Sequence, residues 1–100
     1  MAVTSPALDG VIHAPNRLQI CALLMPLEEA EFQMLRDTVG ISDSVLSKQI
    51  TLLEEAGYVG VRKGAMNGRQ RTWARLTGKG RRAFNGHVAA LQKIAALAKR

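Results

Sequence analysis

The sequence predicts a single domain of the α+β class, mainly α with one β-hairpin. Three observations predict it. Apolar residues recur at helical spacing over residues 15–56, with a proline or glycine at each interruption. After Gly57 the pattern changes to alternation around Asn67-Gly68, the strongest two-residue signal for a hairpin. Helical spacing then returns from residue 77 to about residue 98.

Size and composition narrow the class of protein. One hundred residues, 47% hydrophobic and 22% charged, are typical of one globular domain. We expect a flexible N-terminus over residues 1–8 and one domain over residues 9–100. The longest apolar run, residues 20–27, contains Pro26 and is far shorter than the roughly 20 residues of a membrane helix. The lone cysteine and the lack of a signal-peptide pattern favour a cytoplasmic protein without a membrane segment.

The first predicted helix covers about residues 15–25. Pro15 suits the first turn of a helix, and Pro26 ends it. Apolar positions at helical spacing predict its core face, which consists of Leu18, Cys21, Ala22 and Met25.

A second helix is predicted over about residues 27–38. Its first turn would hold Glu28, Glu29 and Glu31, where the helix dipole favours negative charge. Gly40 suits the C-terminal cap of this helix. The apolar stripe of the helix consists of Phe32, Leu35 and Val39.

The third predicted helix, residues 42–56, is the reading helix, the element expected to enter a DNA groove. Ser42 is a good N-cap, and Gly57 closes the helix. Its predicted core face consists of Val45, Leu46, Ile50, Leu53 and Ala56. The opposite face carries Ser44, Ser47, Lys48 and Thr51, which could contact base edges or phosphates. We expect Ser42 to contact DNA as well. The alternative is an ordinary solvated helix face, because such a face also favours Ser, Thr and Lys.

The hairpin, which we call the wing, is predicted over residues 58–76. Its strands are residues 58–63 and 69–76, joined by a turn at residues 64–68. Arg62, Lys63, Arg69 and Arg71 flank the turn and could lie along a phosphate backbone or enter a minor groove. The alternative is a charged edge that prevents aggregation. We expect Trp73 to pack under the arginine stems or against the domain rather than to stack on a base.

Charge divides the chain unevenly. All eight acidic residues lie within residues 1–55, and eleven of the fourteen basic residues follow position 61. A folded domain with so basic a face carries a strong positive potential there, and phosphate backbones are the commonest partner of such a face. The alternative is a basic, solubilising surface.

The last predicted helix, residues 77–98, follows a possible cap at Thr77 and carries a heptad seam. The seam consists of Phe84, Val88, Leu91, Ala95 and Ala98, with Ile94 and Leu97 beside it. We expect it to form a homodimer interface together with Leu18 of the first helix. A two-fold dimer would set two reading helices about 34 Å apart, which suits an inverted-repeat DNA site. The alternative is that the seam packs on residues 15–25 of its own chain.

The predicted order is helix, helix, short turn, helix, basic hairpin and helix. This order is the layout of a winged helix-turn-helix. Three segments resemble bacterial winged-helix regulators of the MarR and ArsR kind: residues 12–20, 41–59 and 71–80, the last with the ending Leu-Thr-Gly-Lys-Gly. The resemblance covers nearly the whole chain and matches compact, stand-alone members.

The resemblance implies a dimeric repressor or activator. It places Ser44, Ser47, Lys48 and Gln49 at the reading positions and Arg69 and Arg71 in the wing. Relatives that sense metals carry a Cys-x-Cys pair or paired His and acid ligands, whereas this chain has Cys21 alone and two distant histidines. We therefore expect no metal and no cofactor, and the identity of any small-molecule effector stays open.

The leading hypothesis is sequence-specific binding of double-stranded DNA by a transcriptional regulator. The alternative is a winged-helix module that binds nucleic acid without sequence preference or depends on a protein partner. Catalysis is disfavoured, because neither histidine has a carboxylate at a useful spacing and Cys21 lies on a predicted core face. A redox role for Cys21 stays open.

Overall fold

The computed structural model describes residues 7–99, so residues 1–6 of the predicted flexible N-terminus lie outside the described part. The elements run α1 (Gly10–His13), α2 (Pro15–Leu24), β1 (Ala30–Glu31), α3 (Phe32–Val39), α4 (Asp43–Glu55), β2 (Val59–Met66), β3 (Arg69–Leu76), α5 (Gly78–Ala96) and a final 3-10 turn, η1 (Leu97–Lys99). The α+β class with a hairpin wing is confirmed.

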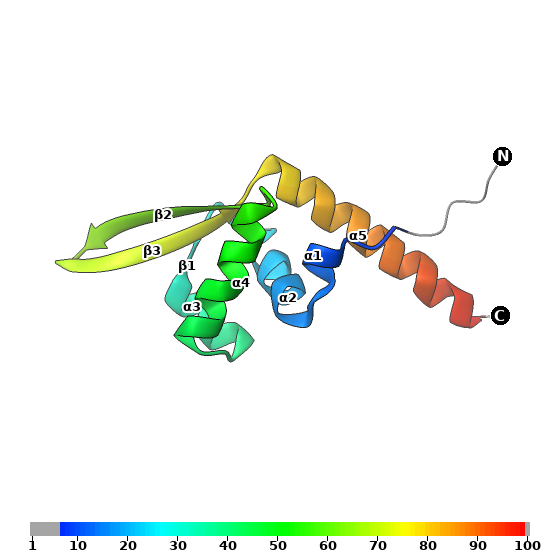
Figure 1. The fold of residues 1–100 in the computed structure, drawn as a ribbon, viewed down its shortest axis with the longest axis horizontal. Coiled ribbons are helices and arrows are strands. Elements are labelled where there is room, and N and C mark those ends of the chain that lie inside the picture. The colour runs from blue at the N-terminus through cyan, green and yellow to red at the C-terminus, as the bar shows by residue number, and fades with distance from the viewer. Residues whose placement is uncertain (1–6, 100) are drawn as a thin grey trace.

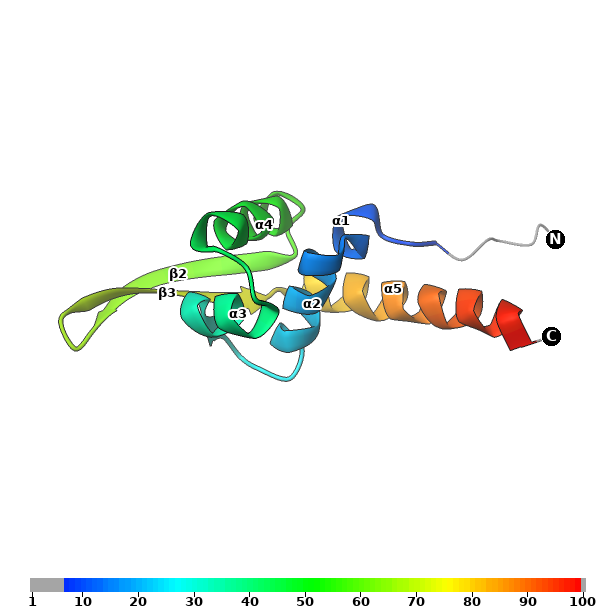
Figure 2. The ribbon, with the colours of Figure 1, turned by 90° about the horizontal axis from the view of Figure 1, so that it is seen from below.

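The molecule is elongated, with extents of 58 × 24 × 22 Å. Helices α1 to α4 form a central body, the β2–β3 wing leaves it at one end, and α5 leaves it at the other (Figures 1 and 2). No helix within residues 7–99 is long and apolar enough to cross a bilayer.

The core lies where α2, α3 and α4 meet the base of the wing. Ile20 and Leu24 of α2 are fully buried there, as is Cys21. Ala22 is exposed, so its predicted place on the core face is wrong. The other buried apolar residues are Ile12, Ala30, Leu35, Leu46, Ile50, Leu53, Val59, Ala74 and Leu76.

The predicted helix over residues 27–38 is wrong in its first turn, because α3 begins only at Phe32. Residues Ala30 and Glu31 instead form a short strand that pairs with Ala74 and Trp73 of β3. The backbone N–H and C=O groups of this segment therefore pair with β3 in the sheet instead of forming a first helical turn. The expected dipole stabilisation by the three glutamates does not apply, but the helix ends at Gly40 (φ 78°) as predicted.

Helix α4 begins as predicted, with the Ser42 Oγ accepting a hydrogen bond from the Val45 N–H at 3.2 Å. Leu46, Ile50 and Leu53 form its buried face. Val45 is 36% exposed, so its predicted place in the core is wrong. Val45 lies at the edge of the apolar arc of the helix, so its side chain is only partly covered.

The wing forms a three-stranded antiparallel sheet with β1, in the order β1-β3-β2. Its turn is tighter than predicted, since both strands extend to Met66 and Arg69 and leave only Asn67 and Gly68 between them. Both turn residues have positive φ, 53° and 75°, which this kind of two-residue turn requires. The wing is therefore long and regular up to its tip.

Helix α1 was not expected from the sequence. Asp9 caps it, because its Oδ1 accepts hydrogen bonds from the Val11 and Ile12 N–H groups at 2.9 and 3.1 Å. At the other end of the chain, Thr77 caps α5 as predicted by accepting from the Gly80 N–H at 3.0 Å. Helix α1 places the side chain of Ile12 in the core, where it is buried.

Candidate nucleic-acid interface

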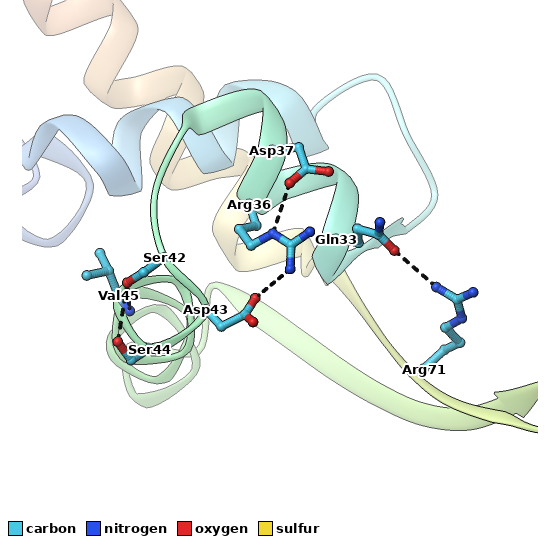
Figure 3. Close-up of polar contacts among 8 residues, drawn as sticks. All are labelled: Gln33, Arg36, Asp37, Ser42, Asp43, Ser44, Val45 and Arg71. Carbon is cyan, nitrogen blue, oxygen red and sulfur yellow. Dashed lines mark hydrogen bonds and ion pairs between the residues drawn. The ribbon is translucent and has the colours of Figure 1, made fainter.

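The outward face of α4 carries the side chains predicted to meet DNA. Ser42, Ser44, Ser47, Lys48 and Thr51 are all exposed. The hydroxyls of Ser42 and Ser44 lie 3.2 Å apart at the start of the helix (Figure 3). Small hydroxyl side chains leave the helix backbone uncrowded, so that this face can approach another surface closely.

A shallow groove of about 270 Å³ separates α4 from the inner face of the wing. It brings Ser47 and Thr51 of α4 together with Lys63 of β2, three residues that the sequence placed in two separate elements. The remaining lining residues are Phe32, Ile50, Glu54, Val61 and Thr72. The carboxylate of Glu54 makes the C-terminal end of this groove less favourable to phosphate than the end at Ser47.

Gln49 lies differently from the other predicted reading residues. It is half-buried, and its Oε1 accepts a hydrogen bond from Arg17 Nη1 at 2.7 Å. Arg17 also donates from Nε to the Val11 carbonyl. Gln49 thus joins α4 to α2 and α1, and its amide oxygen is already satisfied inside the protein.

The outer face of the wing holds Arg62 in place. Its Nη2 and Nε lie 2.6 and 3.2 Å from the two carboxylate oxygens of Glu29, and its guanidinium lies 4.0 Å from the centre of the Trp73 ring. The expectation that Trp73 packs under an arginine is confirmed. The hydrogen bond with Arg62 lowers the pKa of Glu29 and that with Glu29 raises the pKa of Arg62.

Arg71 is also turned toward the body. Its Nη1 donates to the Gln33 Oε1 at 3.2 Å (Figure 3). Its Nε lies 3.8 Å from a Glu31 oxygen. By contrast, Lys63 and Arg69 are exposed and make no salt bridge within residues 7–99. The four predicted wing contacts therefore divide into two that bind the body and two that point to solvent.

An ion-pair cluster joins α3 to the start of α4. Arg36 Nε and Nη1 each lie 2.9 Å from a carboxylate oxygen, of Asp37 and Asp43 respectively (Figure 3). These hydrogen bonds raise the pKa of Arg36. No sequence pattern predicts this cluster, because it links positions across a turn whose geometry the sequence does not give. It fixes the first turn of the reading helix relative to α3.

The side chains of His13 and His87, which are distant in sequence, lie close together where α1 packs against α5. The Asp9 N–H donates to His87 Nδ1 at 2.9 Å, and His87 Nε2 lies 3.2 Å from His13 Nδ1. Since Nδ1 of His87 accepts, its proton is on Nε2 and the ring is neutral. Tyr58 donates to the Asp9 carboxylate at 2.5 Å. This cluster joins α1, α5 and the start of β2.

Burial lowers the pKa of His87, His13 lowers it further, and Asp9 opposes both. Burial raises the pKa of Asp9, but its hydrogen bonds with Tyr58 and the α1 backbone outweigh that effect and the pKa lies below 3.8. Cys21 is fully buried, and burial raises the pKa of its thiol to about 12. Residues 7–99 contain no group of three or more His, Cys, Asp or Glu side chains placed to hold a metal ion.

The predicted dimer residues form two sets. Leu18 and Phe84 are half-buried and pack against the core of their own chain. Further along α5, Val88 and Leu91 are half-buried, whereas Ile94 and Ala95 are exposed, as is Ala98 of η1. Ile94 and Leu97 expose 39% and 63% of their surface, so an apolar stripe continues beyond the body.

Comparison with known proteins gives three matches of note. A family model described as winged helix DNA-binding domain matches residues 16–95. An uncharacterized protein of Methanocaldococcus jannaschii is 35% identical over 78 residues, which cover 78% of this chain and 85% of that protein. A transcriptional regulator homologue from Pyrococcus horikoshii superposes with a TM-score of 0.83 at 23% identity, over 90% of this chain and 89% of that one.

The fold is also shared with a MarR family member. The zinc-responsive regulator ZitR of Lactococcus lactis has a TM-score of 0.65 at 19% identity, over 91% of this chain and 62% of that one. The expected likeness to MarR proteins is therefore confirmed at the level of the fold.

Proposed function

Because the chain belongs to the winged helix DNA-binding domain family, we propose that it regulates transcription as a homodimer that binds a specific sequence of double-stranded DNA. In this proposal α4 enters the major groove, and the tip of the wing contacts the backbone or the adjacent minor groove. Its fold is that of winged helix transcriptional regulators.

The observation that carries the proposal is the groove between α4 and the wing. Ser47 and Thr51 face it from the reading helix and Lys63 faces it from β2. Hydroxyls can bond base edges as well as phosphates, and lysine can bind guanine or phosphate. Varied short side chains beside a single lysine favour recognition of bases, whereas a surface that binds only the backbone would carry more lysine.

The wing contributes positive charge. Lys63 and Arg69 are exposed and form no salt bridge within residues 7–99, whereas Arg62 and Arg71 bind acidic residues near β1. Each phosphate that the protein neutralises adds about 0.9 to the slope of log affinity against log salt concentration. A wing with two available basic residues is therefore expected to supply a modest share of the salt dependence, with the helices supplying the rest.

Dimerisation is proposed from the apolar stripe of α5 that extends past the body. Ile94 and Leu97 are the largest exposed apolar side chains there. A second copy related by two-fold symmetry would cover them and present two reading helices to two half-sites. The inverted repeat in the DNA site follows from that symmetry.

The first experiment is fluorescence anisotropy of a labelled duplex from the gene's own upstream region, titrated with protein at about 150 mM salt against excess unrelated DNA. Binding that survives the competitor, at two chains per duplex, supports the proposal. If competitor abolishes binding on this duplex and on every duplex selected from a random pool, specific recognition is wrong. The remaining function would then be a module that binds without sequence preference.

A further inference from the structure

The outer face of the wing carries a row of interacting side chains that runs across all three strands. The register pairs Arg62 of β2 with Trp73 of β3, and Trp73 with Glu31 of β1. Glu29 precedes β1 and reaches the same face to bind Arg62. This row joins the wing to the connection between α2 and α3.

We propose that Glu29, Arg62 and Trp73 form a strut that fixes the angle of the wing relative to the reading helix, so that Arg62 positions the wing and does not contact phosphate. The inference rests on the proposed DNA-binding function. It revises the sequence-based hypothesis that Arg62 is a DNA contact, which was drawn from its charge and its place in the wing.

The geometry of Arg62 supports a positioning role. Both nitrogens that face Glu29 are within hydrogen-bond distance, at 2.6 and 3.2 Å, and the flat guanidinium also covers the Trp73 ring at 4.0 Å. Trp73 is only 8% exposed beneath it. A guanidinium held on one edge by Glu29 and on one face by Trp73 has a fixed direction, and the carboxylate largely neutralises its charge.

Glycines on the same face leave room for the arginines to lie flat. A Cβ at Gly64 would lie 3.3 Å from the Trp73 ring and 3.4 Å from Arg62, and one at Gly60 would lie 2.7 Å from the Arg75 guanidinium. The sequence pattern of the outer face therefore fits the stacked arrangement, which a larger side chain at either position would crowd.

The strut connects to the reading helix through α3. Glu29 and β1 lead directly into α3, and Arg36 of α3 binds Asp43 at the start of α4 at 2.9 Å. The wing and the reading helix are thus both fastened to the segment of residues 29–36. A change in the strut alters the angle at which the wing tip meets DNA while the recognition surface of α4 stays intact.

The proposal and its rival predict opposite signs for one substitution. If Arg62 binds phosphate, Glu29 competes for it, and Glu29→Gln should tighten DNA binding. If Arg62 is a strut, Glu29→Gln frees the wing, and specific binding should weaken about threefold to tenfold although a negative charge has been removed. Random duplex should be affected much less.

The salt dependence separates the roles further. Arg62→Ala is expected to weaken specific binding at least as much as Glu29→Gln, because it also removes the contact with Trp73, with an unchanged slope of log affinity against log salt concentration. Arg69→Ala is the matched control and should lower that slope by about one unit. The double variant Glu29→Gln/Arg62→Ala should be no weaker than Arg62→Ala alone, because Arg62→Ala already removes the interaction with Glu29. Tighter binding by Glu29→Gln, or a lower slope for Arg62→Ala, would overturn the strut.

A measurement without DNA keeps the strut testable on its own. Spin labels at Ser44→Cys and Met66→Cys, the reading helix and the wing tip, report the distance between them by pulsed electron resonance. Cys21 is fully buried with a thiol pKa of about 12 and should stay unlabelled. Glu29→Gln should broaden the distance distribution. An unchanged distribution contradicts the strut whether or not a specific DNA site is found. If the unsubstituted protein shows no specific DNA binding, only the proposed function is contradicted.

Discussion

At the scale of single residues, the partners of each basic side chain decide its role more than its charge does. Arg62 and Arg71 face the acidic segment around β1, whereas Lys63 and Arg69 face solvent. The sequence could predict four basic residues in the wing and the alternation of their faces. It could not predict their partners, because Glu29 and Glu31 were placed in a helix and meet the wing only through the β1–β3 pairing.

Lys48 is expected to act on specificity. It is exposed on the outward face of α4, where an ammonium group can reach guanine or phosphate in a groove. Lys48→Ala should cost about 1–3 kcal/mol on the specific site and much less on random duplex. Parallel anisotropy titrations on the two duplexes check this. Equal losses on both would assign Lys48 to the phosphate backbone.

His87 should make stability depend on pH. Its pKa is lowered in the folded protein, so between that value and the unfolded value of about 6.5 the unfolded chain binds more protons. Stability is therefore complete above about pH 6.5 and is lost as the pH falls through that window. A protonated ring would also turn a second N–H toward the Asp9 N–H, which now donates to Nδ1.

Urea unfolding at pH 7.5, 6.5 and 5.5 measures this dependence. The free energy of unfolding should fall toward pH 5.5 in the unsubstituted protein and should fall less in His87→Gln, which has no group to protonate there. Asp9, whose pKa is also lowered, loses its contribution only below about 3.8 and does not affect this range. If stability depends on pH in His87→Gln as it does in the unsubstituted protein, groups other than His87 cause that dependence.

At the scale of elements, the predicted features are those with local signals. The wing follows from Asn67-Gly68, α4 from Ser42, and α5 from Thr77, and each of these residues acts on neighbours within a few positions. Strand β1 has two residues and exists because β3 pairs with it. Helix α1 has four residues, too few for a period, although Asp9 before it was an available capping signal.

Gly80 is a position where packing between elements requires glycine. A Cβ there would lie 2.1 Å from the Tyr58 carbonyl oxygen, which itself accepts a hydrogen bond from the Thr77 N–H at 3.0 Å. Gly80→Ala should therefore push α5 away from β2 and lower the free energy of unfolding by about 1–3 kcal/mol.

Gly86 provides the matched control in the same helix. A Cβ at Gly86 would meet nothing within 4 Å, and Gly86 is exposed in the interior of α5. Gly86→Ala should raise the free energy of unfolding by roughly 0.5–1 kcal/mol, because alanine favours the helix. Thermal or urea unfolding of both variants checks the pair, and two shifts of the same sign would contradict the packing argument.

At the scale of the whole molecule, the acidic residues of the first half of the chain also hold basic side chains in position. The acids of the first half bind arginines of the wing and of the α3–α4 corner, so they order the basic surface that they would otherwise weaken. Lys63 and Arg69 of the wing form no salt bridge with these acids within residues 7–99. Charge counts predicted a basic surface, but the arrangement depends on the folded topology.

The two ends of the molecule are expected to depend on each other through dimerisation. Helix α5 leaves the body on the side away from the wing (Figure 2), and Ile94 of α5 and Leu97 of η1 are exposed. Ile94→Glu/Leu97→Glu should give a monomer in size-exclusion chromatography with light scattering, because burying two carboxylates in an apolar interface is strongly unfavourable. Specific DNA binding should fall at least tenfold or so, since one chain contacts only one half-site.

Ala89→Glu is the control for this pair, because Ala89 is exposed and lies on the side of α5 away from the seam and from Ile94 at 100° per residue. It adds a negative charge to the same helix and should leave both the dimer and the DNA affinity unchanged. A double variant that stays dimeric would move the interface to another surface. A monomeric variant with undiminished specific binding would instead separate recognition from dimerisation and leave the inverted repeat without a basis.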